Sequence, residues 1–169
     1  MTTNAAMPDP TMESIGKAVT IGREGDTESA RRDLLDIWNR IGVDGDPFHR
    51  CTLAHYLADL YDSPAVALMW DVRAFDAAAT ITNHRAQQHH ASLQVAGFYP
   101  SLLLNIADNL RRLGSFEAAT DYIDRAGQHT SALARDGYGD MIRTAINEVR
   151  QAISAHDTTP RPSAPSATQ

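Results

Sequence analysis

The sequence predicts an all-α fold, and three observations support this class. Apolar residues recur at intervals of three and four almost everywhere between residues 12 and 156, which is the period of an amphipathic helix. No stretch alternates apolar and polar side chains in the manner of a half-buried strand rich in β-branched residues. Glycines and Asp-Pro or Ser-Pro pairs divide the periodic stretches into segments of helix length. We therefore expect eight helices and no strand.

Local signals mark where the helices of the first half begin and end. Gly25 suits the left-handed position that ends a helix, and Asp26 can cap the helix that follows. Asp46-Pro47 and Ser63-Pro64 each place a capping side chain before a proline in the first turn, so they open the third and fourth helices. The apolar faces of these four helices include Ile15, Ala18, Ala30, Leu34, Ile37, Leu53, Leu57, Ala67, Trp70 and Ala74.

The second half leaves one boundary open. Asn83 is the candidate cap of the fifth segment, whose apolar face keeps its phase through Pro100 to Leu113. Either one long helix kinks at Pro100, or the chain breaks near residues 97–99 and Pro100 opens a new helix. We favour the break, because proline is best tolerated in a first turn. Gly114 then makes a tight corner before the seventh helix. The eighth helix ends near residue 156 and should turn inward Tyr138, Ile142, Ala145, Val149 and Ile153.

One segment of the second half carries a repeat pattern. In residues 100–126, large apolar residues alternate with small ones, at Ala107, Ala119 and Ala126, across two helices and the corner at Gly114. Small residues in these positions let two antiparallel helices approach closely. This segment resembles a tetratricopeptide repeat, particularly the style of kinesin light chains. We expect residues 101–113 and 115 to about 134 to form an antiparallel hairpin with Ala107 near Ala119.

The resemblance implies an α-solenoid of antiparallel helical hairpins, similar to tetratricopeptide (TPR) proteins, with a C-terminal capping helix. Two further hairpins fit the pattern less closely. The corners at Gly25, Ser63 and Gly114 are 38 and 51 residues apart, whereas a standard repeat has about 34 residues. The predicted domain spans residues 12–156. Residues 1–11 and the Pro/Ser/Thr-rich tail at 157–169 have the composition of disordered segments.

Composition excludes several classes of function. The net charge is −6 without a basic stripe, which argues against a nucleic-acid partner. No apolar run is long enough for a membrane span, and the first ten residues do not resemble a signal peptide, so we expect a cytoplasmic protein. Cys51 is the only cysteine, and the seven histidines do not have the i,i+4 spacing of helical zinc sites. We therefore expect neither a metal, nor a cofactor, nor enzymatic activity.

The resemblance also suggests a binding surface. In repeats of this kind, the first helix of each pair lines a concave face on which the partner lies. On the matched unit these positions are Asn105, Asp108 and Arg112, and on the preceding unit they are His55 and Asp59. Asn105 occupies the slot where related repeats use an asparagine amide to hold an extended peptide backbone. We expect all five side chains to line one groove.

The predicted function is a protein- or peptide-binding scaffold that uses this concave face. The alternative is a regulatory or sensor protein of the same architecture, which binds a small peptide or ligand and signals by changing its assembly. A metal- or Cys51-dependent enzyme is a distant third. A short stack of repeats also exposes an apolar end, which leaves open a homo-oligomer.

Overall fold

Eight α-helices and two short 3₁₀ turns form the part of the chain that the computed structural model describes, residues 8–90 and 92–162. The helices are α1 (Pro10–Arg23), α2 (Thr27–Ile41), α3 (Pro47–Ala58), α4 (Pro64–Ala78), α5 (Asn83–His89), α6 (Tyr99–Arg112), α7 (Phe116–Gln128) and α8 (Gly137–Ser154). The 3₁₀ turns are η1 (Val95–Gly97) and η2 (Thr130–Ala132). These residues contain no strand, which confirms the predicted all-α class.

Aspartates cap four of the helices. Asp9, Asp26 and Asp136 each accept a hydrogen bond from the backbone N–H three residues on, at 3.1, 3.0 and 2.8 Å. Asp46 accepts from the N–H groups of Phe48 and His49, at 2.8 and 3.2 Å. Each bond satisfies a donor that the first turn of a helix leaves unpaired. The starts predicted at Asp26 and Asp46-Pro47 are confirmed.

The cap of α5 differs from the one predicted. The Oγ1 of Thr82 accepts the Arg85 N–H at 3.1 Å, and Asn83 is the first helical residue. The Oδ1 of Asn83 instead accepts the N–H of Val95 at 2.9 Å, which ties α5 to η1. Both side chains can cap a helix. The contact with Val95, twelve residues away, decides between them.

The stretch around Pro100 is two helices and not one kinked helix. α5 ends at His89, and the chain passes through η1 before α6 begins at Tyr99. Pro100 is buried in the first turn of α6, where the N–H that it lacks has no helical partner to lose. The favoured break is therefore confirmed.

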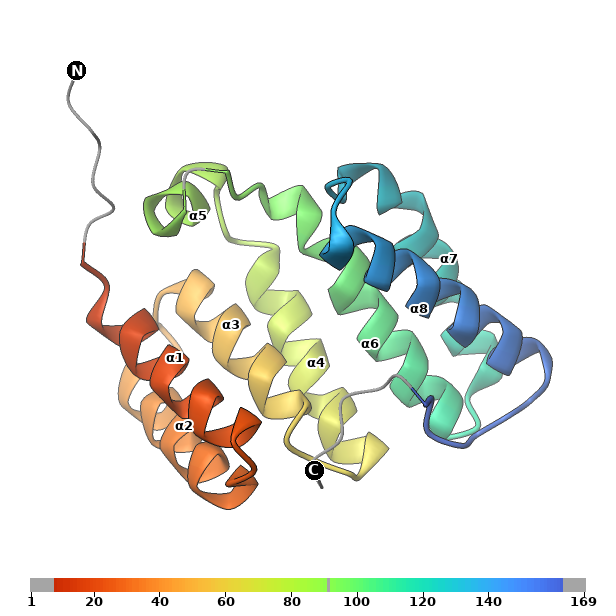
Figure 1. Cartoon of the computed structure of the whole chain (residues 1–169), viewed down its shortest axis with the longest axis horizontal. Coiled ribbons are helices and arrows are strands. Elements are labelled where there is room, and N and C mark those ends of the chain that lie inside the picture. Colours follow the sequence, from red (N-terminus) through yellow and green to blue (C-terminus); the bar gives the residue numbers. More distant parts are fainter. Residues whose placement is uncertain (1–7, 91, 163–169) are drawn as a thin grey trace.

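Consecutive helices pack as pairs. α1 packs on α2, α3 on α4 and α6 on α7, while α4 also packs on α6 and α8 covers both α6 and α7. Figure 1 shows these pairs in a row from α1 and α2 to α7 and α8, with α5 at one edge. Gly114 closes the turn between α6 and α7 with a φ of +77°, in the left-handed region that glycine adopts without strain.

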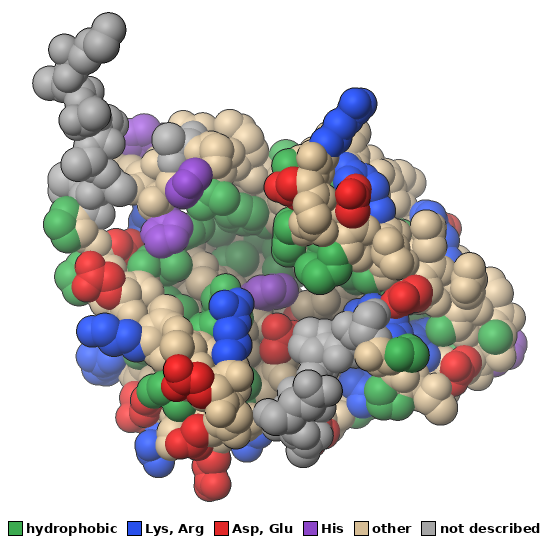
Figure 2. Space-filling model, in the orientation of Figure 1, with side chains coloured by type: hydrophobic (Ala, Val, Ile, Leu, Met, Phe, Trp, Pro, Cys, Tyr) green, Lys and Arg blue, Asp and Glu red, His purple; other side chains and the backbone are tan. Residues whose placement is uncertain are grey.

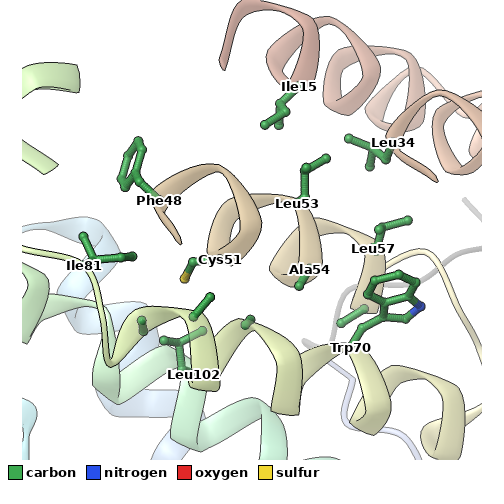
Figure 3. Close-up of a cluster of buried hydrophobic side chains, with 14 of the residues drawn as sticks. Ile15, Leu34, Phe48, Cys51, Leu53, Ala54, Leu57, Trp70, Ile81 and Leu102 are labelled. Atoms are coloured by element: carbon green, nitrogen blue, oxygen red, sulfur yellow. The ribbon is translucent and has the colours of Figure 1, made fainter. Parts of the chain in front are cut away.

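The core has two contiguous parts. The first lies between α1, α2, α3 and α4, where Leu53 of α3 points toward Ile15 and Leu34, and Trp70 of α4 lies near Leu57 (Figure 3). The second lies between α6, α7 and α8. The small residues of the repeat pattern belong to this second part, where Ala107, Ala119 and Ala126 are all fully buried. Their burial allows the close helix approach expected from the sequence.

The first turn of α8 does not turn Tyr138 inward as the sequence predicted. Tyr138 is 52% exposed, although it is in phase with the buried residues Ile142 and Ala145. This turn packs through Gly139, where an added Cβ would lie 2.0 Å from the Ala134 carbonyl oxygen. The close backbone approach turns Gly139 inward, so the neighbouring Tyr138 points toward solvent.

Both ends of the described part are ordered where the composition predicted disorder. α1 begins at Pro10, inside the segment 1–11 that the composition marks as disordered. After α8 the chain turns back, and residues 157–162 run beside α6 (Figure 1). We call residues 157–162 the tail segment. Residues 1–7 and 163–169 lie outside the described part.

Candidate functional site

A buried carboxylate, Asp71, lies at the centre of the candidate site. It belongs to α4 and is 1% exposed. The side-chain amide of Asn109 on α6 donates a hydrogen bond to its Oδ2 at 2.8 Å. The amide of Asn105, one turn earlier on α6, lies 3.4 Å from its Oδ1. Two asparagines on one face of α6 therefore hold this carboxylate between α4 and α6.

Two further carboxylates act on Asp71 and complete what we call the acidic cluster: Asp59, Asp71 and Asp108. Asp59 ends α3, and Asp108 lies on α6. Burial raises the pKa of Asp71 well above its usual range, and the charges of Asp59 and Asp108 raise it further against the two asparagine hydrogen bonds. Burial also raises the pKa of Asp59, an effect that His55 opposes. The cluster favours bound protons or other positive charge.

His55 is the only titratable neighbour that lowers the pKa of Asp59. It lies in the last turn of α3, one turn before Asp59, with its ring near that of Tyr56. Its Nδ1 is buried and has no hydrogen-bond partner among the described residues. Packing therefore holds the ring, and its Nδ1 makes no hydrogen bond to the described residues.

Arg111 joins the acidic cluster to the tail segment. Its side chain is fully buried, and its Nε and Nη2 donate to Asp108 Oδ1 at 3.0 and 2.7 Å. The same guanidinium donates from Nη1 to the carbonyl of Asp157 and from Nη2 to the carbonyl of Thr159, the latter at 2.9 Å. One side chain therefore holds two backbone carbonyls of the tail segment.

A second arginine reaches the cluster from the tail segment itself. Arg161 donates from Nε to Asp108 Oδ2 and from Nη1 to Glu148 Oε2 on α8, each at 3.1 Å. Its side chain is 9% exposed. Within the tail segment, the N–H and the hydroxyl of Thr159 both donate to Asp157 Oδ1 at 2.8 Å. The site consequently holds an arginine and backbone carbonyls at the same time.

Four of the five predicted site residues gather at the acidic cluster. Asp59 and Asp108 belong to it, Asn105 donates to Asp71, and His55 acts on Asp59. Asp108 does not face open solvent, because it is 8% exposed beneath Arg161. Arg112 is directed elsewhere and donates from Nη2 to the Asp62 carbonyl at 3.0 Å, which links α6 to the loop before α4.

Five residues at this site were not predicted from the sequence: Asp71, Asn109, Arg111, Glu148 and Arg161. For Asp71 a signal existed, because it shares the buried face of α4 with Ala67, Ala74 and Ala78. An aspartate in such a stripe needs a polar partner from another helix. For Arg161 the sequence holds no comparable signal, since its composition is that of an unstructured tail.

The face of the molecule seen in Figure 2 is hollowed. In the space-filling view the molecule forms a depression between α3 and the side occupied by α6 and α8 (Figure 2). Hydrophobic side chains form much of its floor, and charged and histidine side chains stand at its edge. A concave surface of mixed character can take an extended chain whose side chains are partly apolar and partly charged.

A second polar network lies at the other end of α3. Arg85 of α5 donates to Asp46 Oδ2 at 2.7 Å and to Asp9 Oδ2 at 3.0 Å. The Nε2 of His49 lies 2.8 Å from the same oxygen of Asp9. A cavity of about 340 Å³ opens beside it, lined in part by Gln88. Because these residues come from the starts of α1 and α3 and from α5, we assign the network to stability.

The pH dependence of stability should separate these two polar regions. Burial pushes the pKa of Asp9 up, but hydrogen bonds from His49, the Met12 N–H and Arg85 lower it from 3.8 to about 2. Its stabilising effect is present above pH 3.8 and is lost as the pH falls toward 2. Asp71 has a raised pKa, so its proton binding increases stability as the pH falls through this raised pKa toward 3.8.

We therefore expect the free energy of unfolding to pass through a maximum on the acid side of neutrality and then to fall. Urea titrations at a series of pH values measure it. Asp71→Asn should reduce the rise to the part that Asp59 contributes, and Asp9→Asn should remove part of the fall. A profile of Asp71→Asn that parallels the wild type would contradict the assignment to Asp71.

Cys51 should be unreactive in the folded protein. It is 6% exposed among apolar side chains of the first core (Figure 3), and burial raises the pKa of its thiol to about 12. The thiolate is the reactive form, so alkylation by iodoacetamide at pH 8 should be at least ~100-fold slower than that of a free thiol. Mass spectrometry follows the reaction, and the protein unfolded in guanidinium chloride is the control. Equal rates in the two states would contradict the burial of Cys51.

Other chemistry receives little support from the described residues. Across 8–90 and 92–162, no three histidine, cysteine, aspartate or glutamate side chains are grouped so that they could hold a metal ion. In the same part of the chain, none of the helices has the length and apolar character needed to cross a membrane.

The chain matches no protein-family model, and comparisons with curated proteins and with solved structures find no match either. The acidic cluster and the tail segment that lies on it are therefore the basis for assigning a function.

Proposed function

We propose that this chain is a TPR-like α-solenoid of three helix pairs and a capping helix, and that it binds an extended peptide on the face formed by α3 and α6. The observation that carries the proposal is the tail segment on α6. Arg111 holds two of its backbone carbonyls, and Asp108 holds its arginine side chain. A surface that accepts a stretch of its own chain through backbone carbonyls and an arginine has the hydrogen-bonding groups to accept another.

The order of the helix pairs along the chain supports the repeat architecture. Three consecutive pairs are followed by α8, and the second helix of the middle pair, α4, packs on the first helix of the next, α6. The 51 residues between the corners at Ser63 and Gly114 exceed a standard repeat. α5 and η1 lie within this interval and contribute the extra length. With this insertion set aside, the spacing approaches that of a repeat of about 34 residues.

Binding fits this face better than catalysis does. The acidic cluster, with Arg111 and two asparagines, offers donors and acceptors but no activated nucleophile, since Cys51 is buried in the core on another side of α3. A phosphate backbone is a poor partner for three neighbouring carboxylates. The proposed partner is therefore a peptide or protein segment without strong negative charge.

Selection of peptides on the full-length protein tests the proposal. A phage-displayed library of random linear peptides supplies the ligands, and hydrogen exchange of backbone amides locates where they bind. We expect slower exchange in α3, α6 and the start of α4. Failure to select any peptide, or protection confined to α2 and α7, would count against the proposed face.

Asn105→Ala should weaken a selected peptide without unfolding the protein, whereas Arg112→Ala should leave its affinity nearly unchanged, because Arg112 is directed to the Asp62 carbonyl. Asn105→Ala removes the hydrogen-bonding groups of one amide, which typically reduces affinity about ten-fold. Neither side chain belongs to the apolar core. Fluorescence anisotropy of the labelled peptide measures the change. Asn39→Ala, an exposed asparagine on α2, is the matched control and should leave the dissociation constant unchanged.

A further inference from the structure

Arg161 binds in a site between α6 and α8 that suits an arginine side chain. Asp108 on α6 and Glu148 on α8 each place one carboxylate oxygen 3.1 Å from a different nitrogen of the guanidinium. The side chain that enters is 9% exposed, so most of its surface is removed from water. Two carboxylates around the fork of a guanidinium give direction as well as charge, and a lysine ammonium would fit this geometry less well.

Arg111 forms the neighbouring part of the site, and its orientation is fixed by Asp108. It is fully buried and fixed by two hydrogen bonds to Asp108, so its remaining donors point in a set direction. They meet the carbonyls of Asp157 and Thr159, which lie four and two residues before Arg161. Backbone carbonyls are present in every sequence. This part of the site therefore recognises peptide backbone, and the carboxylate pair recognises an arginine at one position.

Arg161 and two backbone carbonyls hold the tail segment on α6 and α8. Residues 157–160 and Pro162 are exposed, and Arg161 is the member of the segment that becomes buried. Little apolar surface is covered, so the hydrophobic contribution to this contact is small. A stretch held mainly by one side chain and two carbonyls can be replaced by another stretch that offers the same groups.

Charge around the site favours such a replacement. Asp59 and Asp71 lie in the same acidic cluster as Asp108, and among the described residues neither forms an ion pair with an arginine or lysine. Removal of Arg161 would leave the cluster more negative. An incoming peptide with one arginine restores the lost charge, and a peptide with a second basic residue adds an attraction that the tail segment does not provide.

We propose that the tail segment is an intramolecular occupant of the peptide site, and that the partner is an extended peptide whose arginine replaces Arg161 between Asp108 and Glu148. The proposal rests on the proposed function and gives it a ligand chemistry and a built-in competitor. An attached occupant acts at an effective concentration of about millimolar. A weak partner peptide therefore binds only where its concentration or its additional contacts overcome the tail.

The first test compares wild type with Arg161→Ala in the full chain. The probe is a fluorescein-labelled synthetic peptide with the sequence of residues 157–162, DTTPRP, measured by anisotropy. We expect Arg161→Ala to bind DTTPRP at least ten-fold more tightly than wild type. The peptide DTTPAP should bind neither protein, and DTTPKP should bind more weakly than DTTPRP. Arg161 lies outside every helix, so circular dichroism should show an unchanged fold.

The second test needs no variant. In ¹⁵N-labelled wild-type protein, the Nε–H of Arg161 should give a protected resonance, because it donates to Asp108. Excess unlabelled DTTPRP should replace this arginine and expose its Nε–H to exchange with water, while DTTPAP should not. The isotope distinguishes the arginine of the protein from that of the peptide.

Several results would overturn the inference. One is an equal affinity of DTTPRP for wild type and for Arg161→Ala. Another is binding of DTTPAP as tight as that of DTTPRP. A third is an Arg161 resonance that stays protected at saturating peptide. A wild-type protein that dimerises through Arg161, with Arg161→Ala monomeric at the same concentration, would also overturn it, because the tail would then act between copies. If library peptides without arginine protect α3 and α6 while DTTPRP does not bind, the inference fails and the proposed function stands.

Discussion

Asp108→Ala should lower the free energy of unfolding by about 3–5 kcal/mol, because it leaves a buried guanidinium without its counter-charge. Arg111 is fully buried, and two of its three donor nitrogens bond to Asp108. The substitution also removes one of the two carboxylates that hold Arg161, so the tail segment should detach. Urea unfolding followed by circular dichroism measures the loss.

A second ion pair with the same spacing provides the control. Asp140 and Arg143 on α8 are also three residues apart, at 3.1 Å, but the Asp140 side chain is 77% exposed. Exposed pairs contribute at most about 1 kcal/mol, so Asp140→Ala should change stability far less than Asp108→Ala. Similar losses in both variants would mean that the burial of Arg111 does not govern the effect.

Ala119→Leu should destabilise the protein by about 1–3 kcal/mol, because the added atoms have no room between α6 and α7. Ala119 is fully buried in the same core as Ala107, at the point where the two helices pack. A leucine would force the helices apart or its neighbours into unfavourable rotamers. Thermal unfolding should show a lower Tm.

The control for this prediction is Ala65→Leu, the same substitution at an exposed position in the first turn of α4. Surface substitutions of this kind usually change stability by less than about 0.5 kcal/mol. An unchanged Tm in Ala119→Leu would contradict the close packing of α6 and α7 on which the repeat assignment depends.

Most of the helical structure was predictable because its signals are local. A capping aspartate bonds to an N–H two or three residues away, and Gly114 can adopt its positive φ without strain. Where two adjacent residues could serve, as at Thr82 and Asn83, local reasoning chose the wrong one. The choice depends on Val95, which only the folded chain brings near.

The candidate site was predictable in part for a related reason. The helical period places Asn105 and Asp108 on one face of α6. The resemblance to repeats predicts that α3 lies on the same side of the molecule. The period does not say which polar residues become buried. Asp71, Arg111 and Glu148 acquire their roles from partners on other helices or in the tail segment. Tyr138 shows the same limit, since a contact of Gly139 with Ala134 sets its direction.

The sequence by itself determined the all-α class, where most helices begin and end, and the small residues that allow α6 and α7 to approach. These features depend on backbone bonds and side-chain periods that extend over only a few residues. The tertiary structure alone decided that Arg161 lies against Asp108, 53 residues earlier in the chain. An ion pair between such distant residues forms only when the intervening helices have packed, because no local rule brings its two charges together.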